Sequence, residues 1–406
     1  MSAGESRAVR LFLVGTEFFR SRGGIQYVNR LLVRAFADFE EQAPLGLEIF
    51  SFNDRPEDAV GLPGPSGRIA WHAFSHSRSA LAWGLAWRLN RARPDLLLFT
   101  HVSFLPLAVL VRAISPRTRV AVLAHGAEVW RPLPFNVSHQ LGRADAIVAP
   151  SEYTSQRLVE NNRVDPLRLV QIPHGLGPEW TAESDPGKVS SGSPLVLLSV
   201  ARLVHEETFR GGKGIERVLR AMPEILRLCP DVFYRIIGDG DDRSRLARLA
   251  GELGVSKQVE FLGSIDDEAL RQAYARADLF VLPTTIEGFG LVFLEAMYNR
   301  LPVVAARAAA AVEVVAHGET GILLPPGDEG ALATTIAALL ESPERIREMG
   351  DAGRRRVEDK FLFEHFSRRW QRWLVELLPE AVYRARQAAA YARAVPTAIG
   401  LKESAA

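Results

Sequence analysis

Two glutamates eight positions apart, Glu287 and Glu295, are the residues of this chain best suited to chemistry. The second lies in the segment Leu291–Met297, which is apolar on every face of a helix. That pattern is typical of a helix surrounded by protein. A carboxylate at such a position needs a partner, because burying an unpaired charge is costly.

Two glycines before the apolar segment limit what the partner of Glu295 can be. Gly288 and Gly290 interrupt the regular pattern and predict a helix start close to Gly290. Glu287 then lies on the approach loop and Glu295 more than one turn inside the helix, with the unpaired N–H groups of the helix start between them. Such a helix start suits a phosphate, so a nucleotide sugar would satisfy all three elements. The alternative is that Glu295 pairs with a buried Arg and Glu287 is a solvated loop residue.

Composition is compatible with an enzyme of two or three domains. The chain has 406 residues, 47% hydrophobic and 24% charged, and its net charge of +1 gives no global field for nucleic acid. Only five of the 49 basic residues are Lys, and residues 1–180 hold 20 Arg and no Lys against 16 acids, a balance of +4. The single Cys229 excludes an intrachain disulfide framework and suits a reducing cytoplasm. We expect a cytoplasmic protein, since no apolar run resembles a signal peptide or a membrane span.

Strand and helix patterns alternate along the chain, which predicts an α/β protein with parallel sheets covered by helices on both faces. In the first half the buried strands are expected at Val9–Val14, Leu96–Thr100, Val120–Ala124, Ala146–Ala149 and Leu169–Ile172. In the second half they are expected at Leu195–Val200, Phe233–Ile237, Val259–Leu262, Leu279–Leu282, Val303–Ala305 and Ile322–Leu324.

Five segments follow from this alternation. We expect a Rossmann-like domain over residues 1–178, a Gly/Pro/Ser-rich linker at 179–194 and a second Rossmann-like domain at 195–362. One long helical segment should cover 363–391, followed by a mobile polar tail at 392–406. Doubly wound sheets bind ligands at the carboxyl ends of their strands, so the site should lie there.

The order and spacing of several motifs resemble the retaining glycosyltransferases of the GT-B fold, in particular family 4. The matching pieces are SVARL at 199–203, GGKGIERVLRAM at 211–222, YRIIGDGDD at 234–242, VEFLGSI at 259–265, the two glutamates, and HGETGILLPPGD at 317–328. The resemblance implies two Rossmann-like domains facing one cleft, with the C-terminal helix packing back on the first domain. It also implies metal-independent, retaining transfer of a sugar from a UDP- or GDP-sugar to an acceptor hydroxyl, on a glycan, a lipid-linked precursor or a small molecule.

The resemblance assigns roles to residues of the second half. Arg202 and Lys213 match the positions that face the donor pyrophosphate, where fixed cations stabilise the departing charge. Glu287 would contact the donor sugar, and Glu295 the ribose hydroxyls, whose protons a carboxylate can accept. The remaining donor-binding positions are Gly238, Gly263, Gly288, Phe289, Gly290 and Leu291.

In the first half, Gly23 and Gly24 follow the first strand and open a helix, and the resemblance brings this loop to the donor phosphate and the acceptor. His125 matches an imidazole that contacts the transferred sugar, and Glu128 is a weaker candidate. The plainer interpretations are that the two glycines form a turn and that His125 is a histidine at a strand end whose hydrogen bonds are satisfied within the protein.

The chain departs from the family pattern in the enlarged loop at 203–212, in Ile-Pro-His-Gly at 172–175 and in the Ala-rich stretch at 307–313, which leaves the donor sugar open. The acidic run 239–242 resembles a metal site but fits a helix cap better. Residues 79–93, with Trp83 and Trp87 among arginines, fit either a core helix or peripheral contact with an anionic membrane. The alternative functions are a silent nucleotide-sugar-binding protein and an epimerase or phosphorylase of similar architecture.

Overall fold

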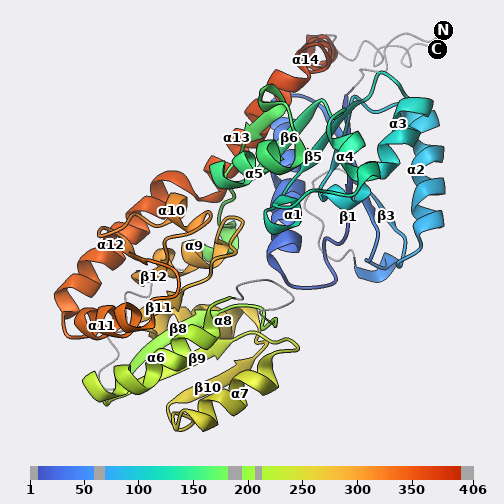
Figure 1. The fold of residues 1–406 in the computed structure, drawn as a ribbon. Helices are drawn as coiled ribbons and strands as arrows, with labels where there is room; N and C mark the ends of the chain where they lie inside the picture. The colour runs from blue at the N-terminus through green and yellow to red at the C-terminus, as the bar shows by residue number, and fades with distance from the viewer. Residues whose placement is uncertain (1–7, 59–68, 182–193, 206–212, 395–406) are drawn as a thin grey trace, which may run out of the picture. The chain divides into compact units, whose positions relative to one another are not determined.

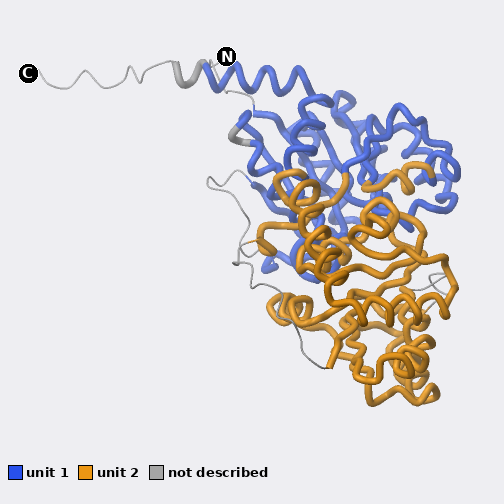
Figure 2. Tube along the Cα trace, turned by 90° about the vertical axis from the view of Figure 1, so that its left-hand side faces the viewer, with its two compact units in different colours: residues 1–149, 157–172, 366–406 blue, residues 150–156, 173–365 orange. Residues whose placement is uncertain are grey.

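The structure, a computed structural model, describes residues 8–58, 69–181, 194–205 and 213–394. The chain divides into two compact units (Figure 2): unit 1 comprises residues 1–149, 157–172 and 366–406, and unit 2 comprises residues 150–156 and 173–365. Most of the predicted linker and tail, and residues 206–212 of the enlarged loop, lie outside the described residues. The predicted domain limits therefore stay a prediction.

Unit 1 is built on a seven-stranded parallel sheet in the order β3-β2-β1-β4-β5-β6-β7 (Figure 1). In the centre of this sheet Leu11 pairs with Leu47 on one side and with Leu96 on the other. The strands are β1 (Val9–Gly15), β2 (Leu45–Ser51), β3 (Ile69–Ala73), β4 (Leu96–Phe99), β5 (Arg119–Leu123), β6 (Ala146–Ala149) and β7 (Leu169–Gln171).

Helices separate these strands, as the alternation predicts. They are α1 (Gly24–Ala37), α2 (Arg78–Ala92), α3 (Ala108–Ile114), α4 (Phe135–Leu141) and α5 (Glu152–Asn162), with short 3-10 turns η1 (Asp38–Glu41), η2 (Pro56–Asp58), η3 (Val102–Leu107), η4 (Ala127–Val129) and η5 (Pro166–Arg168). Phe12 and Val14 of β1 pack in one buried cluster with Leu85 of α2. Leu11 and Leu13 alternate with them and are also fully buried, so both faces of the sheet are covered.

Unit 2 holds a six-stranded parallel sheet in the order β10-β9-β8-β11-β12-β13. Its strands are β8 (Leu195–Val200), β9 (Val232–Ile237), β10 (Val259–Gly263), β11 (Leu279–Leu282), β12 (Val303–Ala306) and β13 (Gly321–Leu324). Its helical segments are η6 (Pro178–Trp180), α6 (Ile215–Leu228), α7 (Arg243–Glu252), α8 (Asp267–Arg276), α9 (Leu291–Tyr298), α10 (Ala311–Val314), α11 (Glu329–Leu340) and α12 (Pro343–Lys360).

Both strand orders reverse once, between β1 and β4 in unit 1 and between β8 and β11 in unit 2. Such a switch point is where an open parallel sheet binds its ligands. The predicted fold class, two Rossmann-like α/β sheets, is confirmed. Two strands were not predicted: β2 and β3 lie toward one edge of the sheet, and every residue of β3 is only partly buried, so no continuous apolar run marks it.

The helical segment predicted at 363–391 is occupied by two helices, α13 (Phe363–Leu377) and α14 (Pro379–Ala394). Pro379 lacks the N–H that would continue α13 and is well placed to open a new helix. The implied return of the C-terminal helix onto the first domain is confirmed. The ring of Trp370 packs edge-on against Phe36 of α1 at 5.9 Å between centroids, and Gln371 donates to the carbonyl of Ala35 at 3.0 Å.

Candidate active site

Helix α9 begins where the sequence predicts. Gly290 caps it with φ of 98°, in the left-handed region, and a Cβ at this position would lie 2.4 Å from the ring of Phe293. The first hydrogen bond of the helix runs from the N–H of Phe293 to the carbonyl of Gly290 at 2.9 Å. The N–H groups of Leu291 and Val292 precede that bond, so they point out of the helix start and suit an anion.

Glu295 lies in the second turn of α9, and its partner is a tyrosine rather than the buried Arg of the alternative interpretation. The hydroxyl of Tyr274 on α8 donates to its carboxylate at 2.7 Å. Burial raises the pKa of Glu295 to about 7; the Tyr274 hydrogen bond opposes this shift, and the charges of Glu179 and Asp267 add to it. A carboxyl group with this pKa changes its protonation near neutral pH.

Glu287 and Lys213 lie together. The Lys213 Nζ is 3.0 Å from a Glu287 oxygen and also donates to the carbonyl of Ile286 at 3.3 Å. Both side chains are largely covered, with 28% and 16% of their surfaces exposed. Lys213 reaches this point because Gly214, with φ of 79°, turns the chain against Pro283, where a Cβ would lie 2.7 Å from the backbone. The structure thus brings two predicted site residues into contact beside the start of α9.

The loop before α9 is fixed by its neighbours. The Ser151 hydroxyl donates to the carbonyl of Gly288 at 2.9 Å, and the ring of Phe289 is buried against His174, 5.2 Å between centroids. The departure to His at 174 therefore has a packing role. Phe289 contributes a core side chain, which leaves its backbone for any ligand contact.

Arg202, Gly238 and Gly263 lie at or just beyond the carboxyl ends of β8, β9 and β10. Arg202, two residues after β8, is exposed. Gly238 follows β9, and its N–H donates to the carbonyl of Gly263 at 2.8 Å. A Cβ on Gly238 would lie 1.9 Å from the carbonyl oxygen of Ala201, so this glycine is required by close backbone packing. Their contact with a donor stays a prediction.

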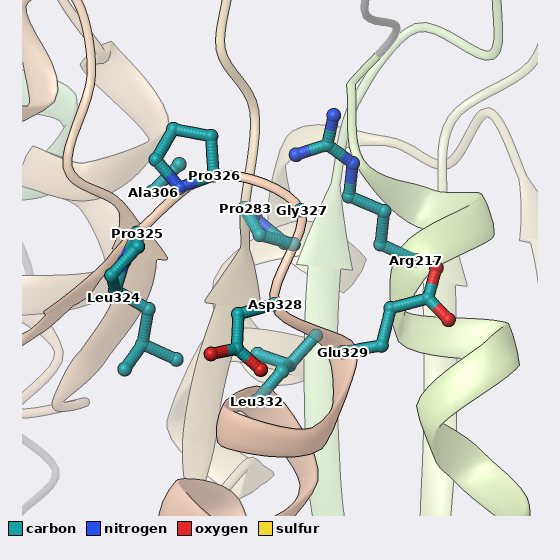
Figure 3. A pocket seen from close by; sticks show the side chains of 10 residues that line it. All are labelled: Arg217, Pro283, Ala306, Leu324, Pro325, Pro326, Gly327, Asp328, Glu329 and Leu332. Atoms are coloured by element: carbon teal, nitrogen blue, oxygen red, sulfur yellow. The ribbon is translucent and has the colours of Figure 1, made fainter.

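A narrow pocket opens where β11, β12 and β13 end (Figure 3). The residues that line it are Arg217, Pro283, Ala306, Leu324, Pro325, Pro326, Gly327, Asp328, Glu329 and Leu332. It adjoins the Lys213 turn through Pro283, against which Gly214 packs.

In the acidic run 239–242, Asp242 is engaged in an ion pair. Asp242 occupies the cap position of α7 without a capping hydrogen bond, and its carboxylate instead pairs with Arg245 at 2.6 Å. Among the described residues, no group of three or more His, Cys, Asp or Glu side chains is arranged to hold a metal ion.

In unit 1, His125 follows β5 and is held from two sides. Its Nε2 donates to the carbonyl of Thr100 at 2.7 Å, and its backbone N–H donates to the carboxylate of Glu128 at 2.5 Å. Burial lowers the pKa of His125, which Glu128 partly opposes, so the ring is neutral at pH 7. Glu128 thus orients the loop that carries His125.

Gly23 and Gly24 lie at the start of α1, with Gly23 extended at the cap and its carbonyl accepting from the N–H of Tyr27 at 2.9 Å. The loop before them is held by Asp54, which sequence inspection missed. An Asp after an unpredicted strand gives no signal of its own. Tyr274 was missed for a similar reason, because a Tyr in an amphipathic helix predicts only core packing.

Comparison with known proteins agrees with this geometry. The profile of Glycosyltransferase Family 4 matches residues 22–180, and that of Glycosyl transferases group 1 matches residues 182–356. The chain is 33% identical over 269 residues to the GDP-mannose-dependent alpha-(1-6)-phosphatidylinositol monomannoside mannosyltransferase of Mycolicibacterium smegmatis, covering 61% of this chain and 68% of the relative. It is 30% identical to the GDP-mannose-dependent monoacylated alpha-(1-6)-phosphatidylinositol monomannoside mannosyltransferase of Corynebacterium glutamicum, covering 88% and 96%.

Solved structures share the fold. A glycosyltransferase from Rickettsia africae superposes with a TM-score of 0.73 at 17% identity, covering 91% of this chain and 99% of the other. Anabaena HepE, in a complex with UDP, superposes with a TM-score of 0.72 at 19% identity, covering 90% and 100%.

Two Rossmann-like sheets, each with its switch point, and the solved structures that share them define the GT-B fold. The family profiles and the named relatives identify a glycosyltransferase that uses a nucleotide-sugar donor. The match extends through both halves of the sequence. The chain belongs to glycosyltransferase family 4, the group 1 glycosyl transferases.

Proposed function

We propose that this glycosyltransferase moves a mannosyl or closely related hexosyl group from a GDP-sugar to a hydroxyl of a phosphoinositol-containing glycolipid or glycan, with retention and without a metal. The names of both relatives above, each GDP-mannose-dependent and each acting on a phosphatidylinositol mannoside, support the donor and the acceptor class.

The observation that carries the proposal is the contact of Lys213 with Glu287 beside the start of α9. Lys213, with Arg202, would stabilise the charge that develops on the leaving diphosphate, and Glu287 would hold the sugar. Glu295 would accept hydrogen bonds from the ribose hydroxyls. His125 would contact the transferred sugar as a neutral imidazole.

We infer front-side attack by the acceptor hydroxyl, with its proton passing to the leaving phosphate. Glu287 and Glu295 lie on either side of a phosphate-suited helix start, which is a poor position for the carboxylate pair of a glycosidase. No side-chain nucleophile is then needed, because the acceptor hydroxyl itself attacks the sugar, and no side-chain base is needed, because the leaving phosphate takes the proton.

Peripheral membrane contact on the inner face of the cell membrane is part of the proposal and rests on α2. Its buried side is formed by Leu81, Leu85 and Leu89, while Trp83 and Trp87 are 76% and 46% exposed. The guanidinium of Arg91 lies 4.1 Å from the ring of Trp87. Exposed tryptophans beside arginines suit an anionic lipid surface. No helix in the described part of the chain has the length and apolar character needed to span a bilayer.

Thermal unfolding in the presence of GDP-mannose, UDP-glucose, GDP and UDP tests the donor, since a ligand at 100 times its dissociation constant adds about 2.7 kcal/mol of stability. Release of free nucleotide diphosphate with a phosphatidylinositol mannoside acceptor tests transfer. A stabilised protein without release would be the silent binding protein, and turnover of the sugar without release would indicate the epimerase. Transfer activity should persist in EDTA. A loss of activity that added metal restores would instead indicate a metal site at residues 239–242.

A further inference from the structure

Asp54, three residues after the end of β2, fixes the loop that leads from β1 to α1. It is fully buried, and its carboxylate accepts the backbone N–H groups of Phe18 at 2.7 Å and Arg20 at 2.9 Å, with that of Phe19 between them at 3.3 Å. The Ser51 hydroxyl donates to the same carboxylate at 2.7 Å. A buried charge is tolerated when it is hydrogen-bonded in this way. The backbone of Arg20 is therefore held at the carboxyl edge of the sheet.

A strained turn after β3 lies against the same loop. Ser75 and His76 adopt φ of 45° and 68°, in the left-handed region that residues with a Cβ rarely enter. The N–H of Ser75 donates to the carbonyl of Asp54 at 3.2 Å, and that of His76 to the carbonyl of Phe52 at 2.7 Å. Backbone strain of this kind persists only where the surroundings hold it and is concentrated at functional sites.

The two anchored loops bring two basic side chains together. The Arg20 Nη1 lies 3.2 Å from the His76 Nε2 and 3.4 Å from the carbonyl of Asn53, and both side chains are exposed. Arginine is always a donor, so the Nε2 of His76 is the acceptor in this contact. A phosphate placed between the two side chains, at the ligand-binding edge of the sheet, would instead accept from the guanidinium fork and from His76 in the tautomer that carries its proton on Nε2.

We propose that Arg20 and His76 bind a phosphate group carried by the acceptor, and that buried Asp54 acts as a positioning residue that sets their spacing. This inference rests on the proposed function in one respect, the phosphoinositol nature of the acceptor. A phosphate monoester on a soluble polyol and the phosphodiester of a lipid headgroup share this chemistry.

Calorimetric titration of myo-inositol 1-phosphate without any donor tests the pair, with myo-inositol as the unphosphorylated probe. We expect Arg20→Ala to weaken binding of the phosphate about tenfold to a hundredfold, the effect of losing one charged hydrogen-bonding partner, and His76→Ala to weaken it about threefold to tenfold. Arg117→Ala is the matched control, because Arg117 is exposed just before β5, at the opposite edge of the sheet. Equal affinity of Arg20→Ala and the unaltered protein for the phosphate would overturn the proposal.

The same variants separate this inference from the proposed function. A protein that binds inositol phosphate through Arg20 but transfers no sugar would refute the function and leave the phosphate site standing. If Arg20→Ala instead weakens GDP-mannose binding and leaves inositol phosphate binding unchanged, the pair belongs to the donor site and the proposal fails.

The source of the phosphate follows from flotation with phosphatidylcholine vesicles that contain or lack phosphatidylinositol. A lipid headgroup is the source if Arg20→Ala reduces binding only to the vesicles with phosphatidylinositol, and a soluble phosphate is the source if Arg20→Ala weakens binding of inositol phosphate alone.

Asp54→Asn tests the positioning role. We expect faster hydrogen exchange at Phe18–Arg20 and a higher KM for the phosphorylated acceptor, with the donor KM unchanged; an unchanged acceptor KM in a folded Asp54→Asn protein would remove Asp54 from the proposal. Should this variant not fold, the comparison of Arg20→Ala with Arg117→Ala decides.

Discussion

The Tyr274 hydroxyl and the Glu295 carboxylate form a 2.7 Å hydrogen bond between α8 and α9. This contact supplies the partner that an acid in an apolar helix requires, without a cation. Burial raises the pKa of Tyr274 well above its usual value, so the phenol stays protonated and remains the donor. The carboxylate keeps its other lone pairs for a ligand.

Replacing Glu295 should stabilise the ligand-free protein at high pH. With a pKa of about 7 in the folded state against an ordinary 4.5, Glu295 holds a proton that the unfolded chain has released, so its contribution to stability falls as pH rises from about 4.5 to 7. Glu295→Gln should therefore raise the free energy of unfolding by on the order of 3 kcal/mol at pH 8 and by little at pH 4.5, relative to the unaltered protein. Urea unfolding at both pH values measures this; a gain that does not depend on pH would contradict it.

Donor affinity should have the opposite pH dependence. Ribose hydroxyls are bound best by the ionised carboxylate, so GDP-mannose affinity should rise between pH 6 and pH 8, in step with deprotonation of Glu295. Calorimetry across this range tests the expectation, and Glu295→Ala should abolish the slope together with about a hundredfold or more of donor turnover. A slope that survives in Glu295→Ala would assign it to another group.

Tyr274→Phe should move that pH dependence upward. The lost hydrogen bond stabilises the ionised form of Glu295, so the pKa of the carboxyl should rise further and donor affinity at pH 7 should fall about threefold to tenfold. Tyr234→Phe is the control, because Tyr234 is an equally buried tyrosine of unit 2 whose hydroxyl bonds to Ser199 at 2.9 Å. Equal effects of the two substitutions would mean a general loss of packing.

Lys213→Ala should reduce donor turnover by about a hundredfold or more, as loss of one charge-stabilising group does. Lys257→Ala, on an exposed lysine of the same unit, should leave turnover unchanged. Steady-state kinetics with release of nucleotide diphosphate measures both. Full activity of Lys213→Ala would remove Lys213 from the site.

His125 should make the protein sensitive to acid. Its folded pKa lies below the ordinary 6.5, so its contribution to stability is complete above pH 6.5 and is lost as pH falls through the folded value. His125→Asn should lose less stability than the unaltered protein between pH 6.5 and 5, while activity at pH 7.5 should fall. Thermal unfolding at these pH values decides, and parallel losses in both proteins would exclude His125 as the source.

Much of the fold was predictable from the sequence, because fully buried parallel strands such as β4, β6 and β11 are short apolar runs. The start of α9 was equally clear from Gly290, since a left-handed cap favours glycine. What the sequence did not contain are contacts made across the fold. Tyr274 meets Glu295 from another helix, and Asp54 meets Phe18 from another strand. Neither type nor spacing marks a side chain whose partner is distant in the chain.

The contact between Lys213 and Glu287 has a consequence for release of the nucleotide diphosphate product. In the ligand-free protein the two side chains satisfy each other, so a donor must draw Lys213 away from Glu287. On the proposed roles, an intact nucleotide sugar offsets the cost of breaking this ion pair, because its sugar hydroxyls donate hydrogen bonds to Glu287. A spent nucleotide offers no such exchange, and the re-forming ion pair then competes for Lys213 and favours departure of the nucleotide diphosphate. One 3.0 Å contact would thus distinguish substrate from product and speed release of the nucleotide diphosphate.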